Sequence, residues 1–201
     1  MRISATRWPK ASPGARPTDS NSGTELVIRP IEPGDKAALA SAIEQSSDEA
    51  VYRRFLNPHG RLTAAELRYL TEIDHRDHEA LVAVDPRSGQ SVGVARYVRD
   101  QEVPHRAEIA VAVLESWQGG GVGKTLLRRL ADRARDEGIT QFTALMLSSN
   151  RPMRRVLEDL GPPRLHSSGA GAIELLVDLP AKRSVTSTTG PGLERLARPG
   201  R

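Results

Sequence analysis

The chain has 201 residues and no cysteine, and its 29 Lys and Arg residues exceed its 25 Asp and Glu residues, for a formal net charge of +4. This length suits one domain with a sizeable core, and the lack of cysteine excludes disulfides and any thiol nucleophile. There is no run of about 18 apolar residues to span a membrane, and residues 1–23 lack the apolar segment of a secretory signal. The 2 Trp, 3 Tyr and 2 Phe do not alternate with basic residues as they do in nucleic-acid binders. We therefore expect a cytoplasmic protein with no membrane and no nucleic-acid partner.

The two ends of the chain differ in composition from its middle. Residues 1–23 and 181–201 are rich in Ser, Thr, Pro, Gly and Arg, which is typical of disordered tails. Residues 24–180 hold the apolar patterns and show no internal repeat. We expect these middle residues to form a single domain.

The first half of this domain is expected to form one strand and then three helices. An N-cap Ser or Thr followed three residues later by Glu satisfies two backbone N–H groups, and Thr63 and Glu66 have this spacing. The expected elements are a strand over 25–29, a helix over about 33–45, a helix capped by Ser46 or Ser47 that carries Tyr52, Phe55 and Leu56, and a helix from Thr63 through Leu67, Leu70 and Ile73.

The second half alternates strands with helices. Residues 85–89 have the composition of a turn, so the strands that flank them should form a hairpin. Apolar residues three and four apart predict a long helix that Gly138 ends. The expected elements are strands over 81–84, 92–98, 107–113, 142–147 and 173–179, and helices over about 121–137 and 151–160.

A glycine-rich turn, Glu-Ser-Trp-Gln-Gly-Gly-Gly-Val-Gly-Lys-Thr, occupies residues 115–125, between a strand and the long helix. Such a turn lets backbone N–H groups and a helix N-terminus approach a phosphate. Its last residues resemble the end of a P-loop, but that loop needs glycine at position 118, where this chain has Gln118. A nucleoside triphosphatase is therefore the less favoured interpretation.

The motif Gln118-x-x-Gly121-x-Gly123 resembles the pyrophosphate loop of the GNAT acetyltransferase superfamily. Upstream, Val-Leu-Glu-Ser-Trp resembles the family's strand exit, with Glu115 in place of a proline; downstream, a strand is followed by Asn150 and a helix. The resemblance covers about residues 25–179. It implies an α/β GNAT fold, with a mixed central sheet of six or seven strands that is flanked by helices and splayed between its fourth and fifth strands.

The resemblance implies acetyl-CoA as the acyl donor. Its pyrophosphate needs N–H donors from one turn, glycine lets the backbone approach without a Cβ, and the helix N-terminus adds about half a positive charge. Two of the side chains have a second interpretation, because Lys124 is also a plausible surface lysine and Asn150 a plain helix N-cap. The implied donor-binding residues are Val111, Val113, Gln118, Gly119, Gly120, Gly121, Val122, Gly123, Lys124 and Asn150.

Glu108 is the predicted general base. A lysine amine with a pKa of roughly 10.4 is almost wholly protonated at neutral pH, so a carboxylate beside it has to accept its proton. A charge within an apolar strand costs stability unless it is exposed or used, and the resemblance places a glutamate base here. The alternatives are that Glu108 faces solvent or pairs with Arg106, and Glu115 is the second choice of base. The tyrosine acid that the family often uses is absent, because its position holds Leu157.

No metal site is expected. His75 and His78 lie in Asp-His-Arg-Asp-His without a further cluster of ligands, so both are interpreted as solvated. His59 and His105 carry no assigned role.

A narrower resemblance concerns the acceptor. Residues 46–56, Ser-Ser-Asp-Glu-Ala-Val-Tyr-Arg-Arg-Phe-Leu, resemble a segment of bacterial protein lysine acetyltransferases, Ser-x(3–5)-Tyr-x-Arg-Phe; the alternative is an amphipathic helix that packs on the sheet. We therefore expect direct transfer of an acetyl group to an amine, with a protein lysine favoured over a small amine. A non-catalytic module that senses acyl-CoA is the alternative from another class. These patterns do not fix the oligomeric state.

Overall fold

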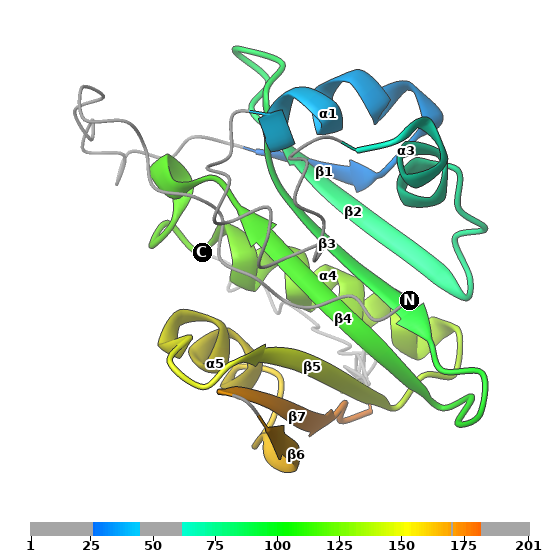
Figure 1. The fold of residues 1–201 in the computed structure, drawn as a ribbon, viewed down its shortest axis with the longest axis vertical. Helices are drawn as coiled ribbons and strands as arrows, with labels where there is room; N and C mark the ends of the chain where they lie inside the picture. Colours follow the sequence, from blue (N-terminus) through cyan, green and yellow to red (C-terminus); the bar gives the residue numbers. More distant parts are fainter. Residues whose placement is uncertain (1–25, 45–61, 170, 182–201) are drawn as a thin grey trace, which may run out of the picture.

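The computed structural model describes residues 26–44, 62–169 and 171–181. Within them, one seven-stranded sheet has the order β1-β2-β3-β4-β5-β7-β6, and β4 and β5 are its parallel pair (Figure 1). The strands are β1 (Val27–Pro30), β2 (His78–Val84), β3 (Ser91–Arg99), β4 (Arg106–Val113), β5 (Gln141–Leu147), β6 (Arg164–Gly169) and β7 (Ala172–Asp178). The helices are η1 (Pro33–Asp35), α1 (Lys36–Glu44), α3 (Ala64–Thr71), η2 (Glu115–Trp117), α4 (Val122–Asp136) and α5 (Arg151–Glu158), where η denotes a 3-10 helix.

The sheet divides between β4 and β5. These strands pair only where they begin, at Arg106–Gln141, Ala107–Phe142 and Glu108–Thr143. β4 nevertheless stays paired with β3, and β5 with β7, to their far ends. The two halves of the sheet therefore diverge beyond Glu108, which confirms the predicted splay between the fourth and fifth strands (Figure 1).

Helix α4 covers one face of the sheet and forms the main core with it. Its buried side chains recur at three- and four-residue spacing, as the sequence predicted, and they pack with Ala107 and Ile109 of β4. Alternate strand residues point to opposite faces, so Ala112 joins a smaller cluster with Val94 on the other face. By the same alternation, Glu108 lies on the face away from α4.

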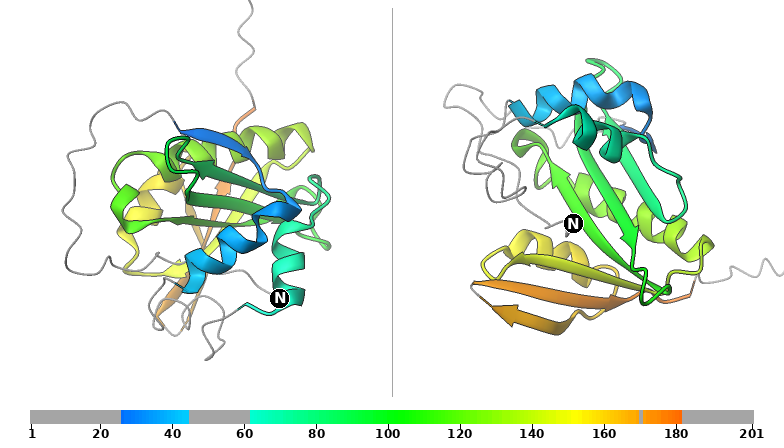
Figure 2. Two further views of the ribbon diagram at one scale, coloured as in Figure 1. Left: turned by 90° about the horizontal axis from the view of Figure 1, so that it is seen from above. Right: turned by 45° about the vertical axis from the view of Figure 1, so that its right-hand side comes forward.

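Helices α1 and α3 pack against each other through Leu39 and Leu70 (Figure 2). The predicted capping box at the start of α3 is confirmed, because Thr63 Oγ1 accepts a hydrogen bond from the Glu66 N–H and Glu66 Oε2 accepts one from the Thr63 N–H, at 3.2 and 2.7 Å. Gly138, with φ of 76°, follows the end of α4 as predicted. The start of α3 and the end of α4 are therefore determined by residues close to them in sequence.

Some elements differ from the prediction. β6 was not expected, because its sequence, Arg-Leu-His-Ser-Ser-Gly, is exposed throughout and carries no apolar alternation. β2 begins earlier than predicted, at His78, and α3 ends at Thr71 rather than reaching Ile73. The predicted helix with Tyr52 and Phe55 lies outside the described residues, as do residues 1–23 and 182–201, so the domain bounds of 24 and 180 stay a prediction. No helix in the described part of the chain is long and apolar enough to cross a membrane.

Candidate active site

The glycine-rich turn joins β4 to α4 through the short helix η2. Gly119 and Gly121 both have φ of 82°, a left-handed conformation that other residues adopt at a cost, and Gly121 is the N-cap of α4. A Cβ at either position would meet no atom within 4 Å. These glycines are therefore required by the backbone conformation, and they leave open space in front of the turn. Gln118 holds the turn in place, because its Nε2 donates to the Val113 carbonyl at 2.9 Å.

The open space belongs to a cleft of about 590 Å³ between β4, the turn and α5. The structure brings nearly all the predicted donor-binding residues to its wall, and Gly120 is the exception. Those that line it are Val111, Val113, Gln118, Gly119, Gly121, Val122, Gly123, Lys124 and Asn150. The sequence interpretation missed the other lining residues, which are Ala112, Trp117, Arg151, Pro152, Met153, Arg155, Val156 and Asp159. The spacing of four between residues 151, 155 and 159 is the signal that marks one face of α5.

The β4 side of the cleft is the strand edge that the splay leaves open. Beyond Glu108, the described residues of β4 have no pairing partner on β5. Val111 and Val113 lie on this stretch and line the cleft. An extended ligand with amide groups can hydrogen-bond to such an edge as an added strand would.

Two of the polar predicted residues have structural partners. Asn150 is the N-cap of α5, and its side chain accepts a hydrogen bond from the Met153 N–H at 3.2 Å. Lys124 Nζ lies 2.9 Å from Asp159 Oδ1, so an ion pair links the first turn of α4 to the end of α5. Both side chains line the cleft while making these contacts.

Glu108 lies at the base of the splay rather than in the wall of the cleft. It faces Val98 on β3 and Thr143 on β5, and its Oε1 atom is buried. Arg106, one alternative partner, instead pairs with Asp100 at 2.9 Å. The second-choice base, Glu115, lies in η2 and is partly buried. The carboxylate of Glu108 is therefore partly shielded, on the opposite face of β4 from the main core.

No tyrosine among the described residues lines the cleft. Leu157 is fully buried in the main core, Tyr69 is exposed on α3, and Tyr97 is buried with its hydroxyl donating to the Arg76 carbonyl at 2.9 Å. Burial is the main reason that the pKa of Tyr97 is raised. Neither described tyrosine is placed to donate a proton into the cleft.

The prediction of solvated histidines is wrong for His78, whereas His75 keeps 36% of its side chain exposed. His75 Nδ1 lies 2.8 Å from Glu79 Oε1. His78 is half-buried beside the ring of Tyr69, and its Nε2 lies 3.2 Å from an Arg96 guanidinium nitrogen. Burial and then the Arg96 charge lower the pKa of His78 to about 4. No group of three or more His, Asp or Glu residues that could hold a metal occurs in the described part of the chain.

Comparison with known proteins agrees with this geometry. Residues 44–161 match the model of the Acetyltransferase (GNAT) family. Acetyltransferase Pat of Mycolicibacterium smegmatis is 32% identical over 164 residues, which are 82% of this chain but 49% of that protein. The chain therefore spans about half the length of this relative.

Solved structures give the same result. The GNAT domain of S. lividans PAT has a TM-score of 0.67 and 34% identity, over 77% of this chain and 90% of that one. The Salmonella typhimurium protein yncA, solved with its cofactor acetyl-CoA, has a TM-score of 0.62 over 79% of this chain and 96% of that one. At 22% identity, this second likeness is one of fold alone. The family match and these relatives show that the chain belongs to the acetyltransferase (GNAT) family.

Proposed function

We propose that this chain transfers an acetyl group from acetyl-CoA directly to the side-chain amine of a protein lysine. The main observation behind the proposal is that two features of the site lie on the same strand, β4. The end of β4 forms a wall of a cleft next to a glycine turn, and Glu108 lies where β4 and β5 separate. Acyl-CoA is the donor of this family, and acetyl-CoA is the donor proposed here.

The cleft fits the chemistry of acetyl-CoA. The turn offers backbone N–H groups and the N-terminus of α4 to a pyrophosphate, with no Cβ in front of Gly119 or Gly121. The open edge of β4 offers hydrogen-bonding groups to the amides of the pantetheine arm. Asn150 lines the cleft at the start of α5, and its side-chain amide can form hydrogen bonds in addition to the one that caps the helix. Once bound, acetyl-CoA supplies an activated thioester, and the chain supplies the site that orients it.

Glu108 is the proposed proton acceptor for the incoming amine. It is the acidic residue within β4, and it lies at the last point where β4 and β5 are joined. Its shielded position limits its solvation, which strengthens its interaction with a positively charged ammonium group. With no cysteine in the chain, direct transfer to the amine is favoured over an acyl-cysteine.

Similarity to Pat proteins supports a lysine acceptor. The relatives include Acetyltransferase Pat and the GNAT domain of S. lividans PAT, at 32% and 34% identity. The Ser-to-Phe segment at residues 46–55 resembles the same group, although it lies outside the described residues. Both observations favour a protein substrate over a small amine.

The test is donor turnover against an acceptor panel. Free-thiol release from acetyl-CoA is measured with lysine-bearing proteins, peptides and small amines, and acetyl-lysine is then detected by mass spectrometry. We expect release with protein lysines and little with small amines. Acetyl-CoA binding without turnover on any acceptor would favour a sensing module, and turnover on small amines alone would overturn the lysine assignment.

A further inference from the structure

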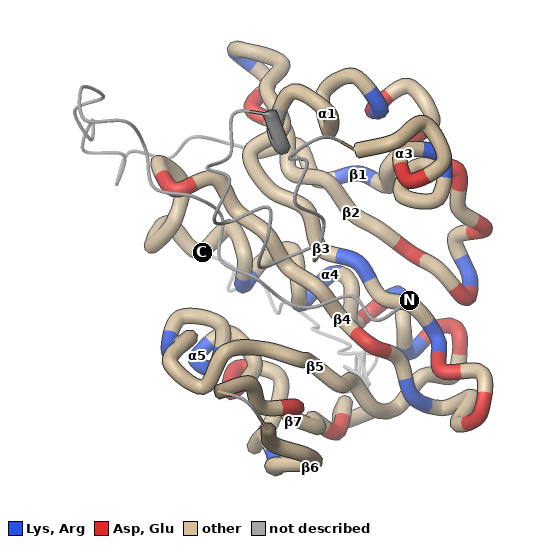
Figure 3. Tube along the Cα trace, in the orientation of Figure 1, with Lys and Arg blue, Asp and Glu red and all other residues tan. Residues whose placement is uncertain are grey.

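Helix α5 carries three arginines, and they differ in position. Arg151 and Arg155 line the cleft, whereas Arg154 does not. Residues four apart lie on one face of a helix, so the two cleft arginines stand one above the other along α5. Figure 3 shows basic positions along this helix. The helix therefore presents two guanidinium groups to the space that the glycine turn borders.

The arginines also differ in their partners. Arg154 lies 3.3 Å from Glu158 and forms an ion pair with it. Among the residues that the structure describes, the guanidinium groups of Arg151 and Arg155 make no ion pair or side-chain hydrogen bond. The third basic residue of the cleft, Lys124, is paired with Asp159. The two cleft arginines are thus the basic groups there that no carboxylate neutralises.

The remaining surfaces of the cleft are suited to other parts of a ligand. Val111, Val113, Met153 and Val156 are among its apolar lining residues. The turn around Gly121 offers N–H groups to one phosphate group. Because the turn and α5 form different parts of the cleft wall, a ligand with a second anionic group can engage both arginines while its first anionic group lies at the turn.

Coenzyme A carries such a group, the 3′-phosphate on its ribose, in addition to its pyrophosphate. We propose that Arg151 and Arg155 bind the 3′-phosphate of the donor and so select CoA thioesters over their dephospho-CoA counterparts; this inference rests on the proposed CoA donor. A phosphate monoester carries about −1.5 to −2 charges at neutral pH, and the planar guanidinium fork suits its oxygens. Two such contacts should favour the phosphorylated ligand by about tenfold or more.

The test compares two ligands that differ only in this phosphate. Dissociation constants for CoA and 3′-dephospho-CoA are measured by calorimetry on the full chain, at one ionic strength. Parent protein should bind CoA about tenfold or more tightly than dephospho-CoA. The double variant R151Q/R155Q should lose most of this preference by weakening CoA binding, while dephospho-CoA binding changes little. R154Q is the matched control on the same helix and should keep the parental ratio.

Several outcomes would overturn the inference. The arginines do not recognise the 3′-phosphate if the parent binds both ligands equally well. The same follows if the ratio of the two dissociation constants is unchanged in R151Q/R155Q. An equal drop in R154Q would show a general effect of charge rather than a site. If circular dichroism shows that the double variant is unfolded, R151Q and R155Q are each tested alone, and at least one must lower the ratio. Failure of the parent to bind either ligand would instead contradict the proposed donor.

Discussion

Glu108 of β4 lies opposite Thr143 of β5, and this is the last residue pair that joins the two strands. Thr143 is buried and one oxygen of Glu108 is buried, so the carboxylate is held where the sheet divides. The same strand continues into the wall of the cleft at Val111 and Val113. One strand therefore connects the proposed donor site with the proposed base.

Replacement of Glu108 by Gln is expected to remove the general base while keeping the size of the side chain. Turnover near neutral pH should fall by about 10²- to 10⁴-fold. Acetyl-CoA affinity should stay near the parental value, because Glu108 does not line the cleft. Part of the loss should be recovered at high pH, where more of the amine acceptor is deprotonated.

Steady-state kinetics across pH, together with calorimetry, would measure both effects. Glu115→Gln is the matched control, since this second glutamate lies in η2 rather than in β4. Near-parental turnover by Glu108→Gln would place the base elsewhere, and unfolding of this variant would show a structural role.

Replacement of Gly121 by Glu is expected to weaken acetyl-CoA binding by at least about tenfold, because a carboxylate would then stand in the open space before the turn. The variant also places a Cβ at φ of 82°, which costs about 1–2 kcal/mol of stability. Gly89→Glu is the control for strain alone, because Gly89 has φ of 69° in the β2–β3 hairpin and no atom lies near its Cβ direction. Urea unfolding should show similar losses for both variants, whereas calorimetry should show a loss of affinity for Gly121→Glu alone. Parental affinity in a folded Gly121→Glu protein would refute the site.

His78 should make stability depend on pH in a defined window. Burial and the Arg96 charge lower its folded-state pKa from about 6.5 to about 4, so the unfolded chain binds the extra proton more readily. Its contribution to the free energy of unfolding is complete above about pH 6.5 and is lost as the pH falls toward about 4. Between about pH 7.5 and pH 5 the loss should be about 1–2 kcal/mol, reduced by the part of the ring that solvent reaches.

His78→Gln should flatten this pH dependence, because its side chain does not titrate. Urea unfolding of both proteins at the two pH values measures the difference. Carboxylates contribute less to the pH dependence of stability between about pH 7.5 and pH 5, because they titrate at lower pH. Asp35 is an example, since its hydrogen bond with Arg29 lowers its pKa. An equal pH dependence in the two proteins would contradict the assignment to His78.

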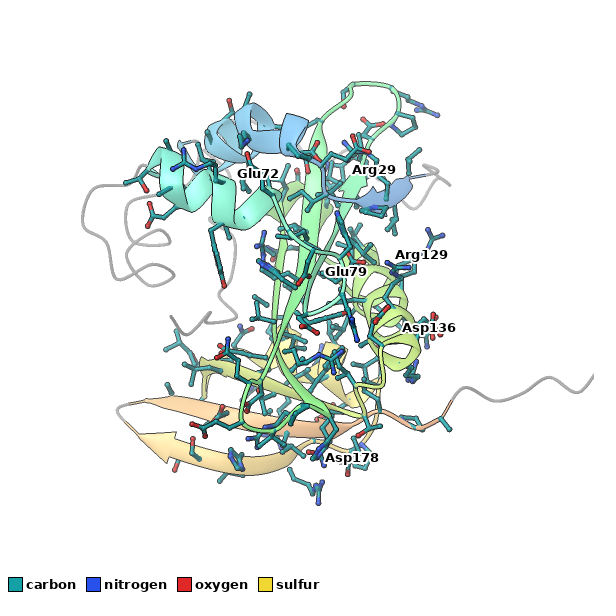
Figure 4. All side chains as sticks on the ribbon, turned by 90° about the vertical axis from the view of Figure 1, so that its right-hand side faces the viewer. Arg29, Glu72, Glu79, Arg129, Asp136 and Asp178 are labelled. Atoms are coloured by element: carbon teal, nitrogen blue, oxygen red, sulfur yellow. The ribbon has the colours of Figure 1, made fainter. Side chains whose placement is uncertain are left out.

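The buried carboxylate of Glu79 should make Arg133 important for stability. Glu79, labelled in Figure 4, is fully buried. Its Oε2 accepts hydrogen bonds from Arg133 of α4 at 2.9 and 3.0 Å. Arg133→Ala would leave this charge with fewer partners, and the free energy of unfolding should fall by about 2–3 kcal/mol, less than for a fully buried pair because Arg133 is half-exposed. Arg129→Ala, one turn earlier on α4, should change it by less than about 0.5 kcal/mol. Equal effects in urea unfolding of the two variants would show that the ion pair adds nothing.

Local features of the fold were predictable from sequence because neighbouring residues determine them. Thr63 and Glu66 form their capping box through atoms three residues apart. Gly121 takes the left-handed conformation that a turn into a helix requires, and the three- and four-residue spacing of apolar side chains fixed the buried face of α4. These patterns and the GNAT resemblance were sufficient to predict the order of strands and helices around the turn and about half of the residues that line the cleft.

The tertiary structure decided what depends on contacts between distant segments. Lys124 pairs with Asp159, and His78 is buried against Tyr69 and Arg96, although these residues are far apart in sequence. The orientation of α5 toward the cleft likewise depends on contacts with distant segments. β6 is held by its pairing with β7 and has no apolar pattern of its own. The sequence by itself thus determined most of the helices and strands and the place of the glycine turn, because local geometry and residue type carry that information. The phosphate-binding role of the turn and the role of Glu108 as base stay proposals. Only the packed sheet decided at which residue pair β4 and β5 separate and which arginines line the cleft, because strand pairing and helix orientation are set by the whole core.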